Sequence, residues 1–198
     1  MVLPNQLTVL RIILTPVFLI LFLSGVPLFV QISLVVFLIA AITDWYDGWL
    51  ARKFNYITEW GKFLDPLADK ILTSTAFIGL LIVGLLQSWM VILIVFRDLF
   101  VTLLRAYADY RRVSFTTSYS AKWKTFLQMV FLYYLLLVYT LQSFTGLHTK
   151  YKNVFETLMN TTGIYFAMLA ITLFTVVTGI TYIFNNRFLI KQLFKREN

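Results

Sequence analysis

The sequence predicts an all-α membrane protein, a polytopic helical bundle with six transmembrane helices. Of its 198 residues, 60% are hydrophobic and only 13% are charged, whereas soluble domains have about 25% charged residues. Several apolar runs approach the ~20 residues that a helix needs to cross a bilayer. Basic residues gather in alternate connections between these runs, as the positive-inside rule requires. The chain is therefore expected to be one membrane domain, residues 1–198, embedded in a lipid bilayer.

The expected elements follow from the apolar runs and the residues that interrupt them. Ser24, Gly25 and Pro27 form a turn signal after the first run, because glycine and proline both break a helix. A polar, glycine-containing connection, residues 142–160, separates the last two runs. The tail, residues 185–198, alternates basic and apolar residues, which is typical of a helix lying at the membrane interface. The six predicted spans are residues 7–23, 28–50, 63–86, 89–107, 125–141 and 162–184.

The distribution of positive charge predicts the orientation. The connections after the first and third spans carry no lysine or arginine, and Lys150 and Lys152 after the fifth span are offset by Glu156. Both termini are thus expected on the cytoplasmic side of a bacterial-type inner membrane. The net charge of +8 fits anionic lipid, and its scatter between spans argues against nucleic acid as a partner. The basic residues that set this orientation are Arg52, Lys53 and Lys62; Arg111, Arg112, Lys122 and Lys124; and Arg187, Lys191, Lys195 and Arg196.

Residue usage restricts the metals that this chain can bind. Cysteine is absent, and His148 is the sole histidine. Thiolate zinc sites, iron–sulfur clusters and multi-histidine zinc sites are therefore excluded. Any metal must be held by oxygen atoms, which indicates magnesium, manganese or calcium.

Four of the six aspartates form the most informative feature of the chain: Asp44, Asp47, Asp65 and Asp69. A carboxylate at the centre of a membrane helix costs about 2.5–3.5 kcal/mol even on lenient scales, so four of them need a strong partner. Residues three or four apart share a helix face, so each of two successive helices presents a pair. Four converging carboxylates suit two divalent cations, which together hold a pyrophosphate.

Small residues accompany the aspartates. Gly48 and Ala51 share the stripe of Asp44 and leave space for a flat base or ribose, and Gly61 leads into the next helix. Arg52 is placed to meet phosphate oxygens with its fork of donors. The alternative is that the four aspartates cap two helix ends on the surface, where they pair with neighbouring lysines and arginines.

The pattern D-x2-D-G-x2-A-R-x8-G-x3-D-x3-D, which begins at Asp44, resembles the signature of the CDP-alcohol phosphatidyltransferases, integral membrane enzymes with six spans. The resemblance implies that Asp44, Asp47 and Asp65 bind Mg²⁺ or Mn²⁺. It also implies that Asp69 binds metal or acts as the general base. Members of the family move a substituted phosphate from a CDP-linked donor to an alcohol and release CMP.

The flanking residues narrow the expected substrates. They resemble the branch of bacterial phosphatidylglycerophosphate synthases at Pro4-Asn5-x-Leu7-Thr8-x2-Arg11, Asp65-Pro66-Leu67-Ala68-Asp69-Lys70, Arg97-Asp98, Arg105 and Ala121-Lys122-Trp123-Lys124. The resemblance implies CDP-diacylglycerol as donor and glycerol 3-phosphate as acceptor. Asn5 and Thr43 are expected to contact the nucleotide. An anionic acceptor needs cations in its pocket, although the positive-inside rule alone also accounts for such charges. The predicted acceptor-binding residues are Arg97, Arg105, Arg112, Lys122 and Lys124.

Other functions stay open at this point. The same chemistry can use phosphatidylglycerol, as in cardiolipin synthesis, or an inositol phosphate as the acceptor. A transporter with the aspartates as a cation site belongs to a different class, but transporters often show internal repeats, and none is visible here. The oligomeric state is not determined by the sequence, and a homodimer is one open alternative.

Overall fold

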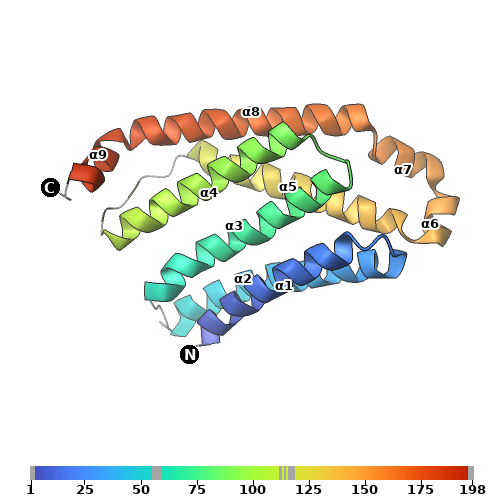
Figure 1. Ribbon diagram of the computed structural model, residues 1–198, viewed down its shortest axis with the longest axis horizontal. Coiled ribbons are helices and arrows are strands. Elements are labelled where there is room, and N and C mark those ends of the chain that lie inside the picture. The colour runs from blue at the N-terminus through green and yellow to red at the C-terminus, as the bar shows by residue number, and fades with distance from the viewer. Residues whose placement is uncertain (1–2, 55–58, 112, 114, 116–118, 196–198) are drawn as a thin grey trace.

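Long helices lie side by side along one axis in the computed structural model (Figure 1). The structure describes residues 3–54, 59–111, 113, 115 and 119–195, and every regular element in these residues is helical. In chain order the helices are α1 (Leu3–Phe22), α2 (Pro27–Phe54), α3 (Glu59–Ile82), α4 (Ser88–Tyr110), α5 (Tyr119–Gln142), α6 (Thr145–Lys150), α7 (Lys152–Leu158), α8 (Thr161–Asn185) and α9 (Arg187–Lys195).

Each of the six predicted apolar segments forms one of the long helices, α1 to α5 and α8. The predicted turn after the first segment is confirmed, and Gly25 has a φ of +69°, a left-handed conformation that glycine adopts without a steric penalty. At the start of α8 the side chain of Asn160 accepts hydrogen bonds from the backbone amides of Thr162 and Gly163. This N-cap satisfies donors that have no partner within the helix.

Three stretches of the described chain are long and apolar enough to cross a membrane: Pro27–Asp44, Tyr119–Gln142 and Lys152–Asn185. The predicted number of six spans is therefore not confirmed by length and composition. The apolar part of α1, Gln6–Phe22, is shorter. Charged side chains interrupt α3 and α4, and several of these residues line the cavity described below.

The helices pack into one bundle around aromatic and aliphatic side chains. Helix α1 packs against α2 and α3, α4 packs against α3 and α8, and α5 contacts α2 and α8. Phe18 of α1 and Phe37 of α2 meet with ring centroids 5.2 Å apart. Large apolar side chains also cover the outside, for example Ile20 (70% exposed) and Phe96 (67% exposed). An outer surface of this kind fits hydrocarbon rather than water, so the chain is a multi-pass membrane protein.

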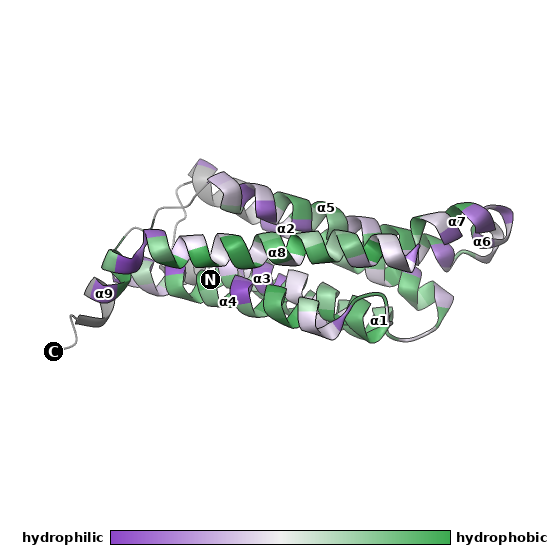
Figure 2. Cartoon of the chain, turned by 90° about the horizontal axis from the view of Figure 1, so that it is seen from above, coloured by the Kyte–Doolittle hydropathy of each residue, from purple (hydrophilic) through white to green (hydrophobic). Residues whose placement is uncertain are grey.

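The two ends of the bundle differ. The N-terminus, the C-terminus and the ends of α2 and α4 lie at one end, whereas α6 and α7 lie at the other (Figure 1). Hydrophobic residues dominate the middle of the helices, and hydrophilic residues gather towards both ends (Figure 2). Helix α9 forms within the predicted interfacial tail.

The segment 142–160 is not only a polar connection, because it contains the short helices α6 and α7. Phe155 of α7 is buried, and the ring of His148 stacks on it at 6.0 Å. The hydroxyl of Tyr134 on α5 donates to the carbonyl of Leu158 at 2.6 Å. These contacts fasten α7 to the bundle, and the sequence pattern did not predict them because they join residues of different helices.

Candidate active site

Helix α1 supplies partners to two of the predicted aspartates. Thr8 and Arg11 are three residues apart and so share one helix face. The guanidinium of Arg11, which is fully buried, lies 2.6 Å from the Asp44 carboxylate on α2. The hydroxyl of Thr8 donates to the Asp65 carboxylate on α3 at 2.5 Å. The two contacts bring the carboxylates of α2 and α3 to the same side of α1.

The third described aspartate, Asp69, belongs to the same group of charges. Its carboxylate pairs with the Lys70 ammonium at 3.2 Å. Asp65 and Asp69 both lie close enough to Asp44 to repel its charge, whereas Arg11 and Lys70 offset that repulsion. We call Asp44, Asp65 and Asp69 the aspartate group. It carries three formal negative charges within one region of a largely apolar protein.

The remaining predicted donor-side residues are only partly described. The structure describes only the backbone of six of them, which lies in α1, α2 and α3: Asn5, Asp47, Gly48, Ala51, Arg52 and Gly61. Thr43 is half-buried, and its hydroxyl donates to the carbonyl of Ala40 at 2.7 Å. The position of Thr43 one residue before Asp44 keeps it next to the aspartate group.

The aspartate group fits a divalent cation in the chemistry of its donors. Its members offer carboxylate oxygens only, and these are the ligands that magnesium and manganese prefer. Among the described residues, no three acidic or histidine side chains are arranged closely enough to hold an ion. Asp47, the fourth predicted ligand, has its side chain outside the described part. Helix periodicity places Asp47 on the same face of α2 as Asp44.

A cavity of about 590 Å³ lies beside the aspartate group, between α3, α4, α5 and α8. Its volume is in the range of small-molecule sites, roughly 300–1,000 Å³. Asp69 lines one side of it, so the cavity borders the predicted metal site. The other lining residues that bear charge are Lys70, Arg97, Asp98, Arg105, Asp109 and Lys122. Among the residues that the structure describes, four cationic and three anionic side chains thus line the cavity.

The cavity gathers three of the predicted acceptor-binding residues, Arg97, Arg105 and Lys122. Lys124 does not line it. The Lys124 side chain is fully buried, and its ammonium lies 2.5 Å from the Asp98 carboxylate. Arg112 lies outside the described residues. Whether Arg97, Arg105 and Lys122 bind an acceptor stays a prediction. Lys124 has a partner within the protein.

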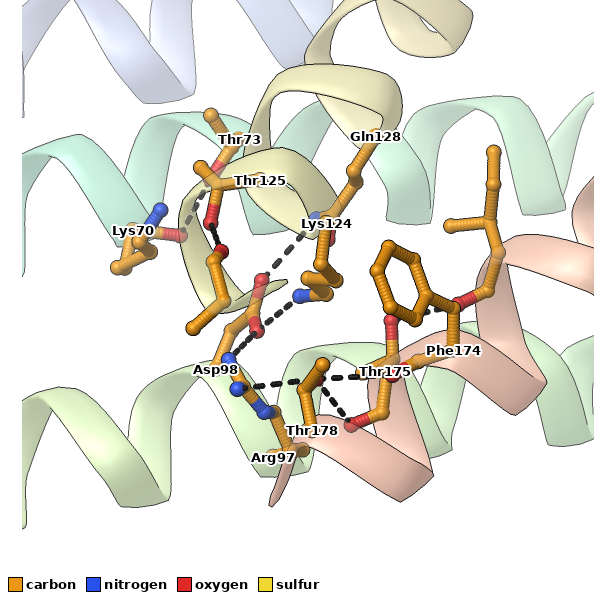
Figure 3. A network of polar contacts seen from close by, with 12 residues as sticks. Lys70, Thr73, Arg97, Asp98, Lys124, Thr125, Gln128, Phe174, Thr175 and Thr178 are labelled. Carbon is orange, nitrogen blue, oxygen red and sulfur yellow. Dashed lines mark hydrogen bonds and ion pairs between the residues drawn. The ribbon is translucent and has the colours of Figure 1, made fainter. Parts of the chain in front are cut away.

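A polar network in the wall of the cavity joins three helices (Figure 3). Its centre is Asp98 on α4, which is only 5% exposed. Asp98 accepts from Arg97 at 3.0 Å, from Lys124 at 2.5 Å and from the amide of Gln128 at 3.0 Å. Arg97 also donates to the Thr178 hydroxyl on α8 at 3.3 Å. A buried charge in a membrane protein needs such partners, and here they connect α4, α5 and α8.

Sequence reasoning missed several residues that shape this region. Thr8, Arg11, Asp98 and Tyr182 received no site role, and all four are buried. Tyr182 lines the cavity, the Arg105 guanidinium lies 5.8 Å from its ring centroid, and its hydroxyl has no hydrogen-bond partner among the described residues. The available signal was a charged or polar residue within an apolar helix, which marks a functional or paired group in membrane proteins.

Replacing Asp98 with alanine should destabilise the protein strongly. The change leaves the buried Lys124 and the half-buried Arg97 without their shared carboxylate, and removing one partner of a buried pair costs about 3–5 kcal/mol. The measurement is the thermal midpoint of the purified protein in detergent. Asp109→Ala is the matched control, because Asp109 is an exposed acid on the same helix. Equal midpoints for the two variants would contradict a structural role for Asp98.

Comparisons with known proteins identify the family of this chain. The family model described as CDP-alcohol phosphatidyltransferase matches residues 1–185. The chain is 44% identical over 115 residues to a Bacillus subtilis protein named CDP-diacylglycerol–glycerol-3-phosphate 3-phosphatidyltransferase, covering 52% of this chain and 60% of that protein. A Rickettsia bellii protein of the same name is 42% identical over 127 residues, covering 64% of this chain and 70% of that protein.

A further relative, from Mycobacterium tuberculosis, is named probable phosphatidylglycerophosphate synthase. It is 44% identical over 131 residues, which covers 65% of this chain and 62% of that protein. The matched part thus spans less than two thirds of the Bacillus and Mycobacterium proteins.

Proposed function

The chain belongs to the CDP-alcohol phosphatidyltransferase family, and from this premise we propose that it transfers the phosphatidyl group of CDP-diacylglycerol to glycerol 3-phosphate. The products are phosphatidylglycerophosphate and CMP. The observation that carries this proposal is the cavity lined by arginines and lysines that borders Asp69. The names of the relatives from Bacillus and Rickettsia support the choice of substrates.

The donor end of the site is the aspartate group together with Asp47. These four carboxylates would hold two divalent cations, Mg²⁺ or Mn²⁺. Bound there, such ions would offset the charge of the pyrophosphate and stabilise the attacking oxygen of the acceptor and the leaving oxygen of CMP. Asn5, Thr43, Gly48, Ala51, Arg52 and Gly61 would surround the nucleotide.

The transfer itself needs a base and a path for the proton. A hydroxyl of glycerol 3-phosphate attacks the phosphorus that bears the lipid, and Asp69 takes the proton of that hydroxyl. A new phosphorus–oxygen bond forms, the bond to CMP breaks, and CMP leaves with the electron pair. Asp69 suits this task because it lines the cavity and also belongs to the aspartate group. Arg52 would offset the charge on the departing CMP.

The proposed acceptor, glycerol 3-phosphate, carries a phosphate group, so its binding site needs cationic side chains. Arg97, Arg105 and Lys122 line the cavity, and charged hydrogen bonds to phosphate are about twice as strong as neutral ones. Arg112 remains a proposed member of this set. Lys124 would influence acceptor binding only indirectly, because its ammonium is paired with the Asp98 carboxylate.

Arg105→Ala should raise the Michaelis constant for glycerol 3-phosphate by about tenfold or more, because a hydrogen bond to a charged group contributes about 1.5–3 kcal/mol. The constant for CDP-diacylglycerol should change little, since that donor is bound at the aspartate group. Steady-state kinetics with each substrate varied in turn measure both constants.

Arg111→Ala is the matched control for this prediction. Arg111 lies near the same end of α4, but it bonds the Tyr107 hydroxyl and does not line the cavity. If Arg105 served only membrane topology, Arg105→Ala would leave both constants at the wild-type value, as Arg111→Ala should.

A panel of acceptors tests the proposed reaction directly. Purified protein is given CDP-diacylglycerol with glycerol 3-phosphate, phosphatidylglycerol or an inositol phosphate, and CMP release is measured. We expect release with glycerol 3-phosphate alone. Release with another acceptor only would keep the family chemistry and refute the acceptor assignment. Release with none of the acceptors, together with uptake of a cation into vesicles, would favour the transporter alternative.

The arrangement in the membrane is also part of the proposal. We infer six spans, α1 to α5 and α8, with both termini and the site at the cytoplasmic face of a bacterial-type inner membrane. The charge pattern supports this orientation, and so does the position of both termini at one end of the bundle (Figure 1). Helix α9 would then lie at the cytoplasmic interface, where its basic residues meet anionic lipid. A homodimer remains one open assembly state.

A further inference from the structure

We propose that Gly179 on α8 is a positioning residue for the anionic end of the acceptor, acting through Arg97. The inference rests on the proposed function and deepens it. It also assigns a role to α8, a helix in which the sequence predicted no site residue.

The backbone of α8 and the side chain of Arg97 approach each other closely at Gly179. Gly179 is buried, and a Cβ atom added to it would lie 3.0 Å from Cγ and 3.3 Å from Nε of Arg97. Both distances are shorter than about nine in ten contacts that real Cβ atoms make. The stem of Arg97 therefore lies directly over Gly179, and a methyl group there requires the stem to shift by a few tenths of an ångström.

Arg97 cannot easily move aside, because its far end is held at two points (Figure 3). One terminal nitrogen donates to Asp98 at 3.0 Å, and the other donates to the Thr178 hydroxyl at 3.3 Å. Thr178 is fixed in turn, since its hydroxyl donates to the carbonyl of Phe174 at 2.8 Å. Asp98 is held by Lys124 and Gln128 on α5. A displacement of the Arg97 stem that carries the guanidinium with it lengthens these bonds.

This arrangement places Arg97 on the wall of the cavity that Asp69 and Arg105 also line. A guanidinium recognises phosphate through a planar fork, so its orientation matters as well as its charge. Small misplacements of positioning groups reduce catalysis substantially. Gly179 itself has no group to offer the acceptor, and its effect is to leave the space that Arg97 occupies.

Gly179→Ala tests this inference, with Gly163→Ala as the matched control. Both glycines lie in α8, but a Cβ at Gly163 would have no heavy atom within 4 Å. We expect Gly179→Ala to raise the Michaelis constant for glycerol 3-phosphate about three- to tenfold, because the shifted guanidinium of Arg97 would bind the acceptor phosphate less well. The constant for CDP-diacylglycerol should be unchanged in both variants. The thermal midpoint should change little, because the ~1 kcal/mol by which alanine favours a helix over glycine offsets the cost of a small shift of the Arg97 stem.

Two further variants separate positioning from a general packing defect. Thr178→Val removes the hydroxyl that accepts from Arg97. It should raise the Michaelis constant for glycerol 3-phosphate and leave the constant for CDP-diacylglycerol unchanged. In an Arg97→Ala background, Gly179→Ala should have no further effect on the constant for glycerol 3-phosphate, because its target side chain is gone.

The outcomes that refute the inference differ from those that refute the proposed function. A wild-type protein that releases no CMP with glycerol 3-phosphate refutes the proposed function. Normal wild-type turnover combined with an unchanged constant in Gly179→Ala refutes the role of Gly179 alone. Equal rises in the Michaelis constants of Gly179→Ala for both substrates, together with a lower thermal midpoint, would also refute the role of Gly179. Such a result indicates only a packing defect.

Discussion

Replacing Asp65 with asparagine should remove nearly all CMP release while the protein still inserts into the membrane. Asp65 belongs to the aspartate group, and its carboxylate accepts from Thr8 of α1. Asparagine keeps the shape and can still accept from Thr8, but it loses the negative charge that a divalent cation needs. Changes to groups that only support metal ligands cost about 10–100-fold in affinity or activity, so loss of a ligand should cost at least about 100-fold.

The assay is CMP release from CDP-diacylglycerol and glycerol 3-phosphate at saturating Mg²⁺. Asp47→Asn should behave in the same way if Asp47 completes the ligand set. Glu156→Gln is the control, since Glu156 is an exposed acid of α7 that pairs with Lys152 at the other end of the bundle. Excess chelator should also stop turnover of the wild type. Normal turnover of Asp65→Asn, or full activity in chelator, would refute the metal hypothesis.

Asp69→Asn should affect turnover more than it affects donor affinity. Asp69 both lines the cavity and belongs to the aspartate group, so it is the member placed to accept a proton from the acceptor hydroxyl. A positioned general base contributes about 10²–10⁴-fold in rate, and kcat should fall by that factor. Binding of CDP-diacylglycerol should remain close to wild type, and Mg²⁺ should still bind at saturating concentration through the three remaining carboxylates.

Equilibrium binding and single-turnover rates of the same preparation separate the two effects. Asp65→Asn serves as the comparison, because a ligand change should weaken metal binding as well as the rate. An Asp69→Asn protein that retains its rate would rule out the base role. A variant that loses only donor binding would show Asp69 to be a metal ligand alone.

The sequence predicted the helices well where the information is local. Each of the six apolar segments became a helix, and the turn at Gly25 formed as expected, because hydrophobic runs and helix breakers act on their immediate neighbours. The segment 142–160 was predicted less well. Its short helices α6 and α7 depend on contacts such as Tyr134 to Leu158, which join different helices.

The sequence by itself determined the family and the position of its aspartates on two successive helices, because motif spacing and helix periodicity are properties of a single segment. Only the tertiary structure decided which side chains meet across helices. It pairs Arg11 with Asp44, binds Lys124 to Asp98 instead of placing it in the cavity, and brings Gly179 of α8 against Arg97. The physical reason is that such contacts depend on the rotation and register of one helix against another, which packing of the whole bundle sets.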